Sequence, residues 1–342
     1  MMRVEIYKLF REGPIVLHIG LRRMDRTSHL IHSDTLFSAL SNSLFKIFDE
    51  NKFKEFEEKL IISSVFPGLR GTSKDILFLP MPNIPINMED EKDHKKYKRF
   101  QWISWNGLKE LLKYYDKDNE IIYLKTIENL KPMNSKFLIS VEEYEELKEF
   151  REKDENIIFM ETNLEPKVSI PRVPIISEEK TQGLYFQENL EFYTITTSTG
   201  KKLIPFLYFL KTKDDSLDEI FIPALNLFIE EGIGGERSTG KGQFDFYEKD
   251  ESDLPDNGDL EITLSLSLPR REEVNNIIYF NLVKRDGFIY YQKPTGYRKK
   301  THFKIGEGSL VRTPYIGENI DVSPIKDMRV ISYGRSIGWK FS

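Results

Sequence analysis

Cysteine is absent from the 342-residue chain, and so is any run of about eighteen apolar residues that could form a membrane span. The first absence excludes disulfides, thiolate zinc sites and a cysteine nucleophile, and it fits a reducing cytoplasm. Because the N-terminus also lacks the apolar core of a signal peptide, we expect a soluble, cytoplasmic protein. The formal net charge of −5 leaves no general excess of basic charge. Any contact with nucleic acid must therefore come from local clusters of Lys and Arg.

Glycine is concentrated in residues 232–242, which read GIGGERSTGKG between a helical pattern and an alternating strand pattern. Because glycine adopts positive φ, it brings backbone N–H groups close to a ligand, and the basic and hydroxyl side chains between the glycines add further donors. A flexible turn is the alternative interpretation. We favour a loop that binds phosphate or nucleic acid, with the predicted contacts Gly232, Gly234, Gly235, Arg237, Ser238, Thr239, Gly240, Lys241 and Gly242.

Two familiar glycine signatures do not fit this loop. Residues 235–241 spell G-x-x-x-x-G-K, but Gly242 follows where a nucleoside-triphosphate loop needs a hydroxyl for Mg²⁺. The order of elements also differs, because here a helix is predicted before the loop and a strand after it. The dinucleotide motif G-x-G-x-x-G fails because Arg237 occupies the third glycine position. We therefore expect neither an ATPase nor a Rossmann site, and no cofactor or metal.

A second basic cluster lies in residues 291–304, which carry no acidic residue and alternate aromatic with basic side chains. Such a pattern is typical of surfaces on which single-stranded nucleic acid stacks. A solvated loop is equally compatible with it. The predicted nucleic-acid contacts of this cluster are Tyr297, Arg298, Lys299 and Lys300.

The first 85 residues predict two strands, a helix and an edge strand. Residues 3–10 and 14–21 have strand patterns, and from residue 36 the apolar residues recur at helical spacing. Ser33 is the predicted N-cap of that helix. The prolines within 76–85 exclude a central position for this strand in a sheet.

The second half predicts further strands. Alternation of leucine and isoleucine with polar residues over 260–268 predicts a half-buried strand. The Asp286-Gly287 pair predicts a hairpin between residues 279–284 and 288–292. The length of the chain indicates two domains. The mixture of helices, strands and hairpins favours an α+β fold over a doubly wound parallel sheet.

Six segments in this order, with the glycine loop, make the chain similar to the RAMP superfamily of CRISPR-associated proteins. Within it, they resemble the type III-A, Csm-type effector subunit of the Cas5-like group, which caps the 5′ repeat-derived tag of the guide RNA. The resemblance runs nearly end to end and rests on HSDTLFSAL (32–40), LFLPMPNIP (77–85), KKYKRFQWIS (95–104), GLYFQENLEFY (183–193), GSLVRTPYIGENIDVSP (308–324) and RVISYGRSIGWKF (329–341).

This resemblance implies two tandem ferredoxin-like (RRM-like) domains with insertions, over residues 1–165 and 166–342, the second containing the glycine loop. It implies a non-catalytic RNA-binding subunit whose partners are the 5′ tag of the guide RNA, the large signalling and nuclease subunit and a backbone RAMP subunit. The chain departs from the family at Pro171-Arg172-Val173-Pro174, where an aspartate-arginine-x-threonine stretch is usual. Further implied RNA contacts are His32, Ser33, Lys167 and Arg172.

The alternative is a repeat-cleaving ribonuclease of the same superfamily. Cleavage without a metal would need a general acid and base, usually histidine, beside the scissile phosphate. His29 and His32 are the candidates because they lie just before the first predicted helix. Against this alternative, residues 32–35 (HSDT) are accounted for by a helix start, with Ser33 as the N-cap and Asp34 at the positive end of the helix dipole. In addition, 100 residues follow Gly242, whereas such nucleases carry the glycine loop near the C-terminus.

Overall fold

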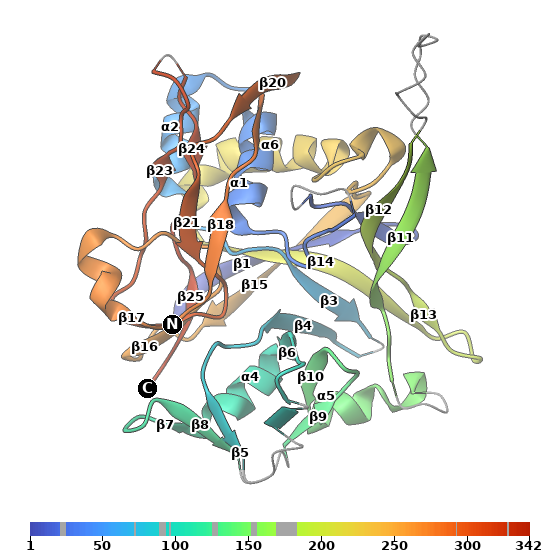
Figure 1. The fold of residues 1–342 in the computed structure, drawn as a ribbon. Helices are drawn as coiled ribbons and strands as arrows, with labels where there is room; N and C mark the ends of the chain where they lie inside the picture. The colour runs from blue at the N-terminus through green and yellow to red at the C-terminus, as the bar shows by residue number, and fades with distance from the viewer. Residues whose placement is uncertain are drawn as a thin grey trace.

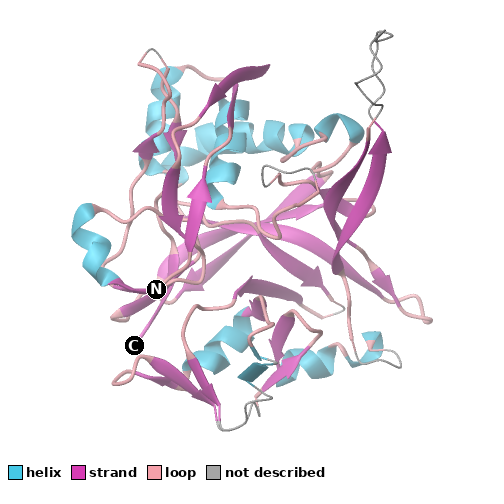
Figure 2. Ribbon diagram, in the orientation of Figure 1, coloured by secondary structure: helices cyan, strands magenta, loops and turns pink. Residues whose placement is uncertain are grey.

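A computed structural model describes the whole chain except residues 21–24, 72, 89–93, 96, 125–128, 152–155, 169–182, 292 and 327. Strands form the centre of the molecule and most helices lie at its outside (Figure 2). Within the described residues, no helix is both long and apolar enough to cross a membrane.

The first structural unit is an antiparallel sheet with the strand order β15–β1–β14–β3. The chain passes through helix α1 between β1 and β3, and through helix α6 between β14 and β15. This order and these crossovers define a ferredoxin-like β-α-β-β-α-β unit. Figure 1 shows α1, α6 and the short helix α2 on the same side of the sheet. The bounds are β1 (Met2–Phe10), α1 (Ser33–Leu44), α2 (Glu50–Lys59), β3 (Phe66–Arg70), β14 (Lys202–Thr212), α6 (Asp218–Glu231) and β15 (Phe246–Leu254).

Helix α1 follows from the predicted spacing of apolar residues. Leu36, Phe37, Leu40 and Leu44 recur at steps of three and four and are all buried. The helix packs against α6, and the Phe37 ring stacks on the rings of Phe56 and Tyr333. The predicted N-cap is wrong by one residue. His32 has the extended backbone of the N-cap, without a side-chain cap hydrogen bond, and Ser33 is the first helical residue.

An insertion between β3 and β14 extends the same sheet with the order β3–β4–β6–β10–β9. The edge position predicted for 76–85 is wrong, because β4 lies between β3 and β6. Pro80 is the last residue of β4 and the other prolines follow it, so the strand interior keeps its N–H donors. The bounds are β4 (Asp75–Pro80), β5 (Ile86–Met88), β6 (Trp102–Ser104), α4 (Trp105–Leu112), β7 (Tyr115–Asp116), β8 (Ile121–Leu124), β9 (Leu130–Pro132), β10 (Phe137–Ser140) and α5 (Val141–Glu146).

A long antiparallel ribbon projects beside the first sheet (Figure 1). Its strands are β11 (Met160–Val168) and β12 (Leu184–Phe192), and β12 also pairs with β2 (Ile15–Leu17). The two-residue strand β13 (Ile195–Thr196) then leads into β14. The ribbon therefore follows the insertion in sequence and, through the pairing of β12 with β2, contacts a segment near the start of the chain.

The second unit repeats the ferredoxin-like strand order as β17–β22–β16–β25, again antiparallel. A 3-10 helix, Arg271–Asn276, takes the place of the first crossover helix. The prediction of a half-buried strand over 260–268 is wrong in its exposure: residues 260–267 are all buried, since β16 is central in its sheet and both of its faces are covered. The bounds are β16 (Leu260–Thr263), β17 (Ile277–Tyr279), β22 (Leu310–Arg312) and β25 (Gly338–Phe341).

The predicted hairpin at Asp286-Gly287 is also wrong. β18 (Leu282–Arg285) pairs with β21 (His302–Ile305), and β19 (Phe288–Tyr291) pairs with β20 (Lys293–Arg298), so the two sides of Gly287 do not pair with each other. One long ribbon bends at Gly287 instead, where φ is 128°. The short strands β23 (Ile320–Asp321) and β24 (Ile331–Ser332) follow it in sequence.

The two units share one continuous hydrophobic core, with buried residues from Val4 to Trp339. The α+β fold with two ferredoxin-like units agrees with the prediction. The expected boundary between residues 165 and 166 falls inside β11, and β1 pairs with β14 and β15 from beyond it. A division there would cut the first sheet, and it would also separate the glycine loop from the unit that β1 begins.

Candidate nucleic-acid interface

The glycine loop is held at both of its ends. Gly232 ends α6 with φ 73°, and its amide donates to the Phe228 carbonyl at 2.8 Å. The Ile233 amide donates to the Gly242 carbonyl, and the Gly242 amide donates to the Val16 carbonyl of β2, both at 2.8 Å. A Cβ on Gly242 would lie 1.8 Å from the Ile233 carbonyl oxygen, so only glycine fits. This geometry favours a fixed loop over a flexible turn.

The outer part of the loop is a single 3-10 turn, Arg237–Thr239, which we call the loop crest. Glu236 and Gly240 flank it with left-handed backbones, at φ 58° and 86°. The amide and hydroxyl of Thr239 both donate to the Glu236 carbonyl, at 3.0 and 2.8 Å. Ser238 and Thr239 are exposed and Arg237 is half-buried. The crest therefore presents two hydroxyls and one guanidinium on a tightly constrained backbone.

The inner side of the loop rests on the segment that follows β2. The Gly235 amide donates to the His18 carbonyl at 2.8 Å, and a Cβ on Gly234 would lie 2.7 Å from the same oxygen. The Arg11 guanidinium donates to the Gly240 carbonyl. The loop thus packs against the beginning of the first unit over most of its length.

Two predicted lysine contacts are paired with carboxylates beside the loop. Lys241 Nζ donates to Glu165 Oε2 at 2.6 Å and to Asn189 Oδ1 at 3.0 Å, and its side chain is only 11% exposed. Lys167 Nζ donates to Glu236 Oε2 at 3.0 Å. The hydrogen bond from Lys241 lowers the pKa of Glu165. Both lysines therefore join the loop to the β11–β12 ribbon, and the ammonium group of each is paired with a carboxylate.

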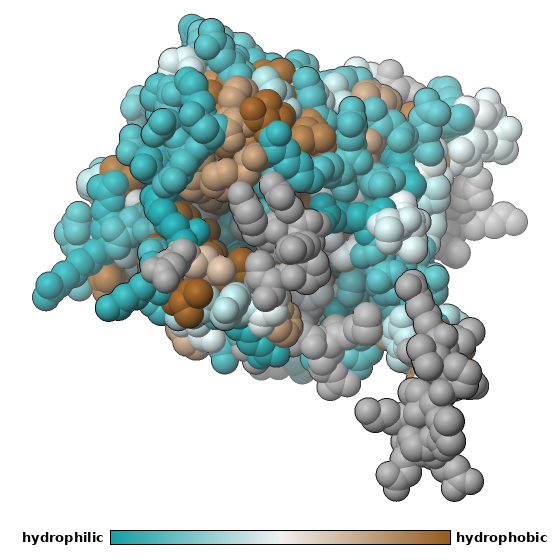
Figure 3. Space-filling view, turned by 90° about the horizontal axis from the view of Figure 1, so that it is seen from above, coloured by the Kyte–Doolittle hydropathy of each residue, from teal (hydrophilic) through white to brown (hydrophobic). Residues whose placement is uncertain are grey.

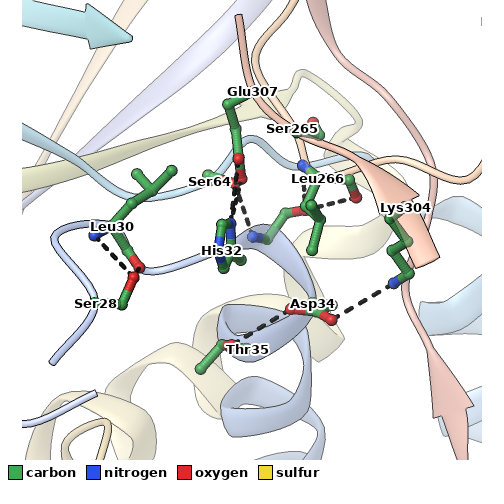
Figure 4. Close-up of polar contacts among 12 residues, drawn as sticks. Ser28, Leu30, His32, Asp34, Thr35, Ser64, Ser265, Leu266, Lys304 and Glu307 are labelled. Carbon is green, nitrogen blue, oxygen red and sulfur yellow. Dashed lines mark hydrogen bonds and ion pairs between the residues drawn. The ribbon is translucent and has the colours of Figure 1, made fainter. Parts of the chain in front are cut away.

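His32 and Ser33 lie at the junction of the two units, and Figure 4 shows His32 beside Ser64 and Glu307. The Ser33 amide donates to Ser64 Oγ at 2.8 Å, and the Ser33 hydroxyl accepts from the Leu266 amide at 3.1 Å. His32 Nδ1 lies 2.9 Å from Glu307 Oε1. Although burial alone would raise it, the contacts with His32 and Ser64 hold the pKa of Glu307 below its usual range. These contacts fix the start of α1 to the second unit.

The neighbouring Asp34 is buried and paired with two cations of the β18–β21 ribbon. Arg285 donates to both Asp34 carboxylate oxygens at 2.8 Å, and Lys304 Nζ lies 3.5 Å from Asp34 Oδ2. Burial alone would raise the pKa of Asp34, but Lys304 and Arg285 hold it well below its usual range. Burial lowers the pKa of Lys304 to about 8. Sequence reasoning missed Arg285 and Glu307, because no local motif marks them, and it placed Lys304 in the basic cluster 291–304 without indicating its Asp34 partner.

The other predicted residues lie on the bent ribbon or outside the described chain. Tyr297 is 46% exposed, and the Arg298 guanidinium stands 4.6 Å from the centroid of the Phe288 ring. The Lys299 and Lys300 amides donate to the carbonyls of Gly287 and Val322, both at 2.9 Å. These four residues therefore form a second basic surface on β20 and the segment after it. Arg172 lies outside the described residues.

The two candidate catalytic histidines have different surroundings. Among the described residues, His29 Nδ1 is buried without a hydrogen-bond partner, and burial lowers the pKa of His29. His32 is held by the Glu307 carboxylate. A histidine fixed by a buried carboxylate at a domain junction has an evident structural role.

Two family models match the chain. The RAMP superfamily matches residues 16–245, which include the first ferredoxin-like unit from β2 to α6 and the glycine loop. The CRISPR Csm4 C-terminal domain matches residues 256–341, which include the second unit. Residues 246–255 separate the two matches and contain β15, which pairs in the first sheet, so the second match begins after the last strand of that sheet.

Curated relatives and solved structures give the same picture. The chain is 28% identical to the "CRISPR system Cms protein Csm4" of Methanocaldococcus jannaschii, over 91% of this chain and 86% of that protein. It is 26% identical to the protein of the same name from Thermococcus onnurineus, over 82% and 81%. Its fold is similar to a chain of the Csm3-Csm4 subcomplex of the type III-A CRISPR-Cas interference complex, with TM-score 0.66, 23% identity and 100% coverage of both chains. A chain of the Csm1-Csm4 cassette in complex with pppApA matches with TM-score 0.55 and 18% identity, over 99% and 98%.

Proposed function

The chain belongs to the RAMP superfamily, and on that premise we propose that it is a non-catalytic RNA-binding subunit of a type III-A CRISPR interference complex. In this proposal it binds the 5′ repeat-derived tag of the guide RNA in the cytoplasm. The relatives that carry the Csm4 name over most of their length support the assignment to this kind of complex.

One observation carries the RNA-binding part of the proposal. The loop crest holds Arg237 and the exposed hydroxyls of Ser238 and Thr239 on a backbone that is fixed at both ends. Donors that are already in place bind a phosphate with little further loss of conformational entropy. We assign the phosphate contacts to the Arg237 guanidinium and the Ser238 hydroxyl, and we assign Thr239, whose amide and hydroxyl both donate to the Glu236 carbonyl, to the support of the crest. Lys241 and Lys167 hold the loop against β11, and the latter also offsets the charge of Glu236.

The partners of the relatives indicate the partners of this chain. One similar fold comes from a Csm3-Csm4 subcomplex and another from a Csm1-Csm4 cassette. We propose that this chain docks in the same way on a backbone RAMP subunit and on the large signalling and nuclease subunit. The chain covers 86% and 81% of the two curated proteins. This coverage supports the proposal that the chain has the same role in the complex as the whole of each relative.

The nuclease alternative needs a histidine that is able to exchange a proton with RNA. His32 Nδ1 is engaged by Glu307, and its side chain is 12% exposed. A general base must reach the proton that it removes. This contact supports the non-catalytic interpretation, and it leaves His29, whose Nδ1 has no hydrogen-bond partner among the described residues, as the second candidate to test.

The test is to incubate the purified chain with labelled repeat RNA in EDTA and to follow binding and cleavage together. We expect RNA to be retained at low salt and recovered intact. Cleavage that disappears in His32→Ala or His29→Ala would establish the enzyme instead. Failure to retain RNA at any salt concentration would leave a scaffold that contacts only proteins.

A further inference from the structure

A groove of about 510 Å³ lies between α1, α2, the start of β19 and residues 328–331. Its volume is in the range of pockets that hold a small organic ligand. Figure 3, which views the molecule from the side of α2 and β20, shows apolar residues bordered by hydrophilic ones on this face. Phenylalanines line the groove, and the rings of Phe45 and Phe53 are 4.5 Å apart between centroids. Phe288, on the opposite wall, is 62% exposed.

The α1 wall of the groove also carries polar groups. Ser38 and Asn42 line it, one helical turn apart. The Asn42 amide nitrogen donates to the Ser38 carbonyl at 2.7 Å, and the amide oxygen of the same side chain can accept a further hydrogen bond. Because a polar group that loses its water needs another partner, an occupant that carries a hydrogen-bonding edge is a better match than a leucine or phenylalanine side chain of a partner protein.

The charge of the groove has one sign. Lys299 and Arg329 line it, and the described lining residues include no acid. Burial lowers the pKa of Lys299, so a bound anion would stabilise its charged form. Arg329 donates to Glu57 at 2.8 Å and keeps 45% of its side chain exposed. The groove therefore suits a ligand that combines a flat apolar body, a polar edge and a negative charge.

We propose that this groove binds one unstacked nucleotide of a single-stranded RNA. The base lies against Phe288, with its edge at the Asn42 amide, and the phosphate lies at Lys299. Bases of single-stranded RNA are commonly held in this way, on aromatic side chains with cations beside them. The Arg298 guanidinium over the same ring strengthens such a stack. The inference rests on the proposed function, and it adds to the glycine loop a second RNA contact that reads a base rather than the backbone.

The test compares Phe288→Ala with Phe280→Ala for binding of a labelled twelve-nucleotide single-stranded RNA. Phe280 is a matched control because it is 47% exposed, does not line the groove and lies outside the basic cluster of residues 291–304. We expect Phe288→Ala to weaken binding by about 5- to 150-fold, the effect that loss of one stacked base has in single-strand binding proteins. Phe280→Ala should bind like the wild type. An RNA with one abasic position in the bound register should weaken wild-type binding and leave Phe288→Ala unaffected.

The outcomes separate this inference from the proposed function. Equal binding by Phe288→Ala and wild type, with a loss in Arg237→Ala, overturns the groove assignment and leaves the loop assignment intact. Absence of RNA binding by the wild type overturns both. Phe288-dependent binding of AMP, GMP, CMP or UMP that single-stranded RNA does not compete away overturns the RNA source and indicates a free nucleotide. Loss of partner-subunit association in Phe288→Ala, with unchanged RNA binding, overturns the nucleotide and indicates a protein contact.

Discussion

His32 Nδ1 lies 2.9 Å from Glu307 Oε1, although 275 positions separate the two residues in the sequence. His32 precedes α1 of the first ferredoxin-like unit, and Glu307 lies between β21 and β22 in the second. The Ser64 hydroxyl donates to the same carboxylate oxygen. The contact therefore joins the two units at a buried point. Removing it by mutation measures how much it contributes to the stability of the protein.

His32→Ala is expected to lower the free energy of unfolding by about 3 kcal/mol, because it leaves the buried Glu307 carboxylate without its hydrogen bond to the imidazole. Urea unfolding at neutral pH measures the loss, and His94→Ala, in a separate part of the chain, serves as the control. The pKa of Glu307 is lowered in the folded state. Its stabilisation is therefore present above the unfolded value of 4.5 and is lost as the pH falls through the lower folded value. A loss in His32→Ala no larger than in the control would contradict this role.

Glu261 gives the opposite dependence on pH. Burial raises its pKa from 4.5 to about 7 in the folded state. Below pH 4.5 both states are protonated; between 4.5 and 7 only the unfolded state ionises, so stability falls as the pH rises by about 3 kcal/mol in total. Glu261→Gln removes this dependence. We expect its advantage over the wild type in urea unfolding to grow by about that amount between pH 4 and pH 8, whereas the exposed control Glu145→Gln should show no such growth. Parallel pH profiles for wild type and Glu261→Gln would rule the mechanism out.

Local patterns predicted the local structure well. The spacing of Leu36, Phe37, Leu40 and Leu44 predicted α1, and the change from helical to alternating pattern around the glycines placed the loop between α6 and β15. Pairing over longer distances was not readable in the same way. Gly287 bends a ribbon rather than closing a hairpin, because β18 finds its partner in β21, across the whole β19–β20 segment.

The candidate site shows the same limit. The glycines of the loop and the hydroxyls of the crest were identified from the sequence because they lie within one segment, but the partners of Lys241 come from β11 and β12. Asp34 lies in the first turn of α1, and its Arg285 partner is 251 positions away. Ion pairs of this kind depend on how the units pack, and composition or spacing within one segment carries no sign of them.

Gly242→Ala is expected to distort the loop, whereas Gly200→Ala is not. Both glycines have positive φ, 68° and 82°, so each substitution carries the backbone strain of about 1 kcal/mol. A Cβ at Gly242 would also collide with the Ile233 carbonyl, while a Cβ at Gly200 meets nothing within 4 Å. RNA binding by anisotropy should therefore weaken at least tenfold in Gly242→Ala and stay unchanged in Gly200→Ala. Equal RNA affinities for the two variants would show that the loop backbone is not part of the RNA site.

The charge of the crest is tested through the salt dependence of RNA binding. Each phosphate contact contributes about −0.7 to the log-log slope of affinity against salt for a single strand. We expect Arg237→Ala to make the slope shallower by about that amount. Lys241→Gln should leave the slope unchanged, because its ammonium is engaged by Glu165 and Asn189. Arg312→Ala removes the same charge as Arg237→Ala at a 51% exposed position that pairs with Glu120 in the insertion, and it controls for the change in net charge. An equal slope in Arg237→Ala and Arg312→Ala would show that the Arg237 guanidinium does not contact an RNA phosphate. A shallower slope in Lys241→Gln alone would show that Lys241, and not Arg237, makes the phosphate contact.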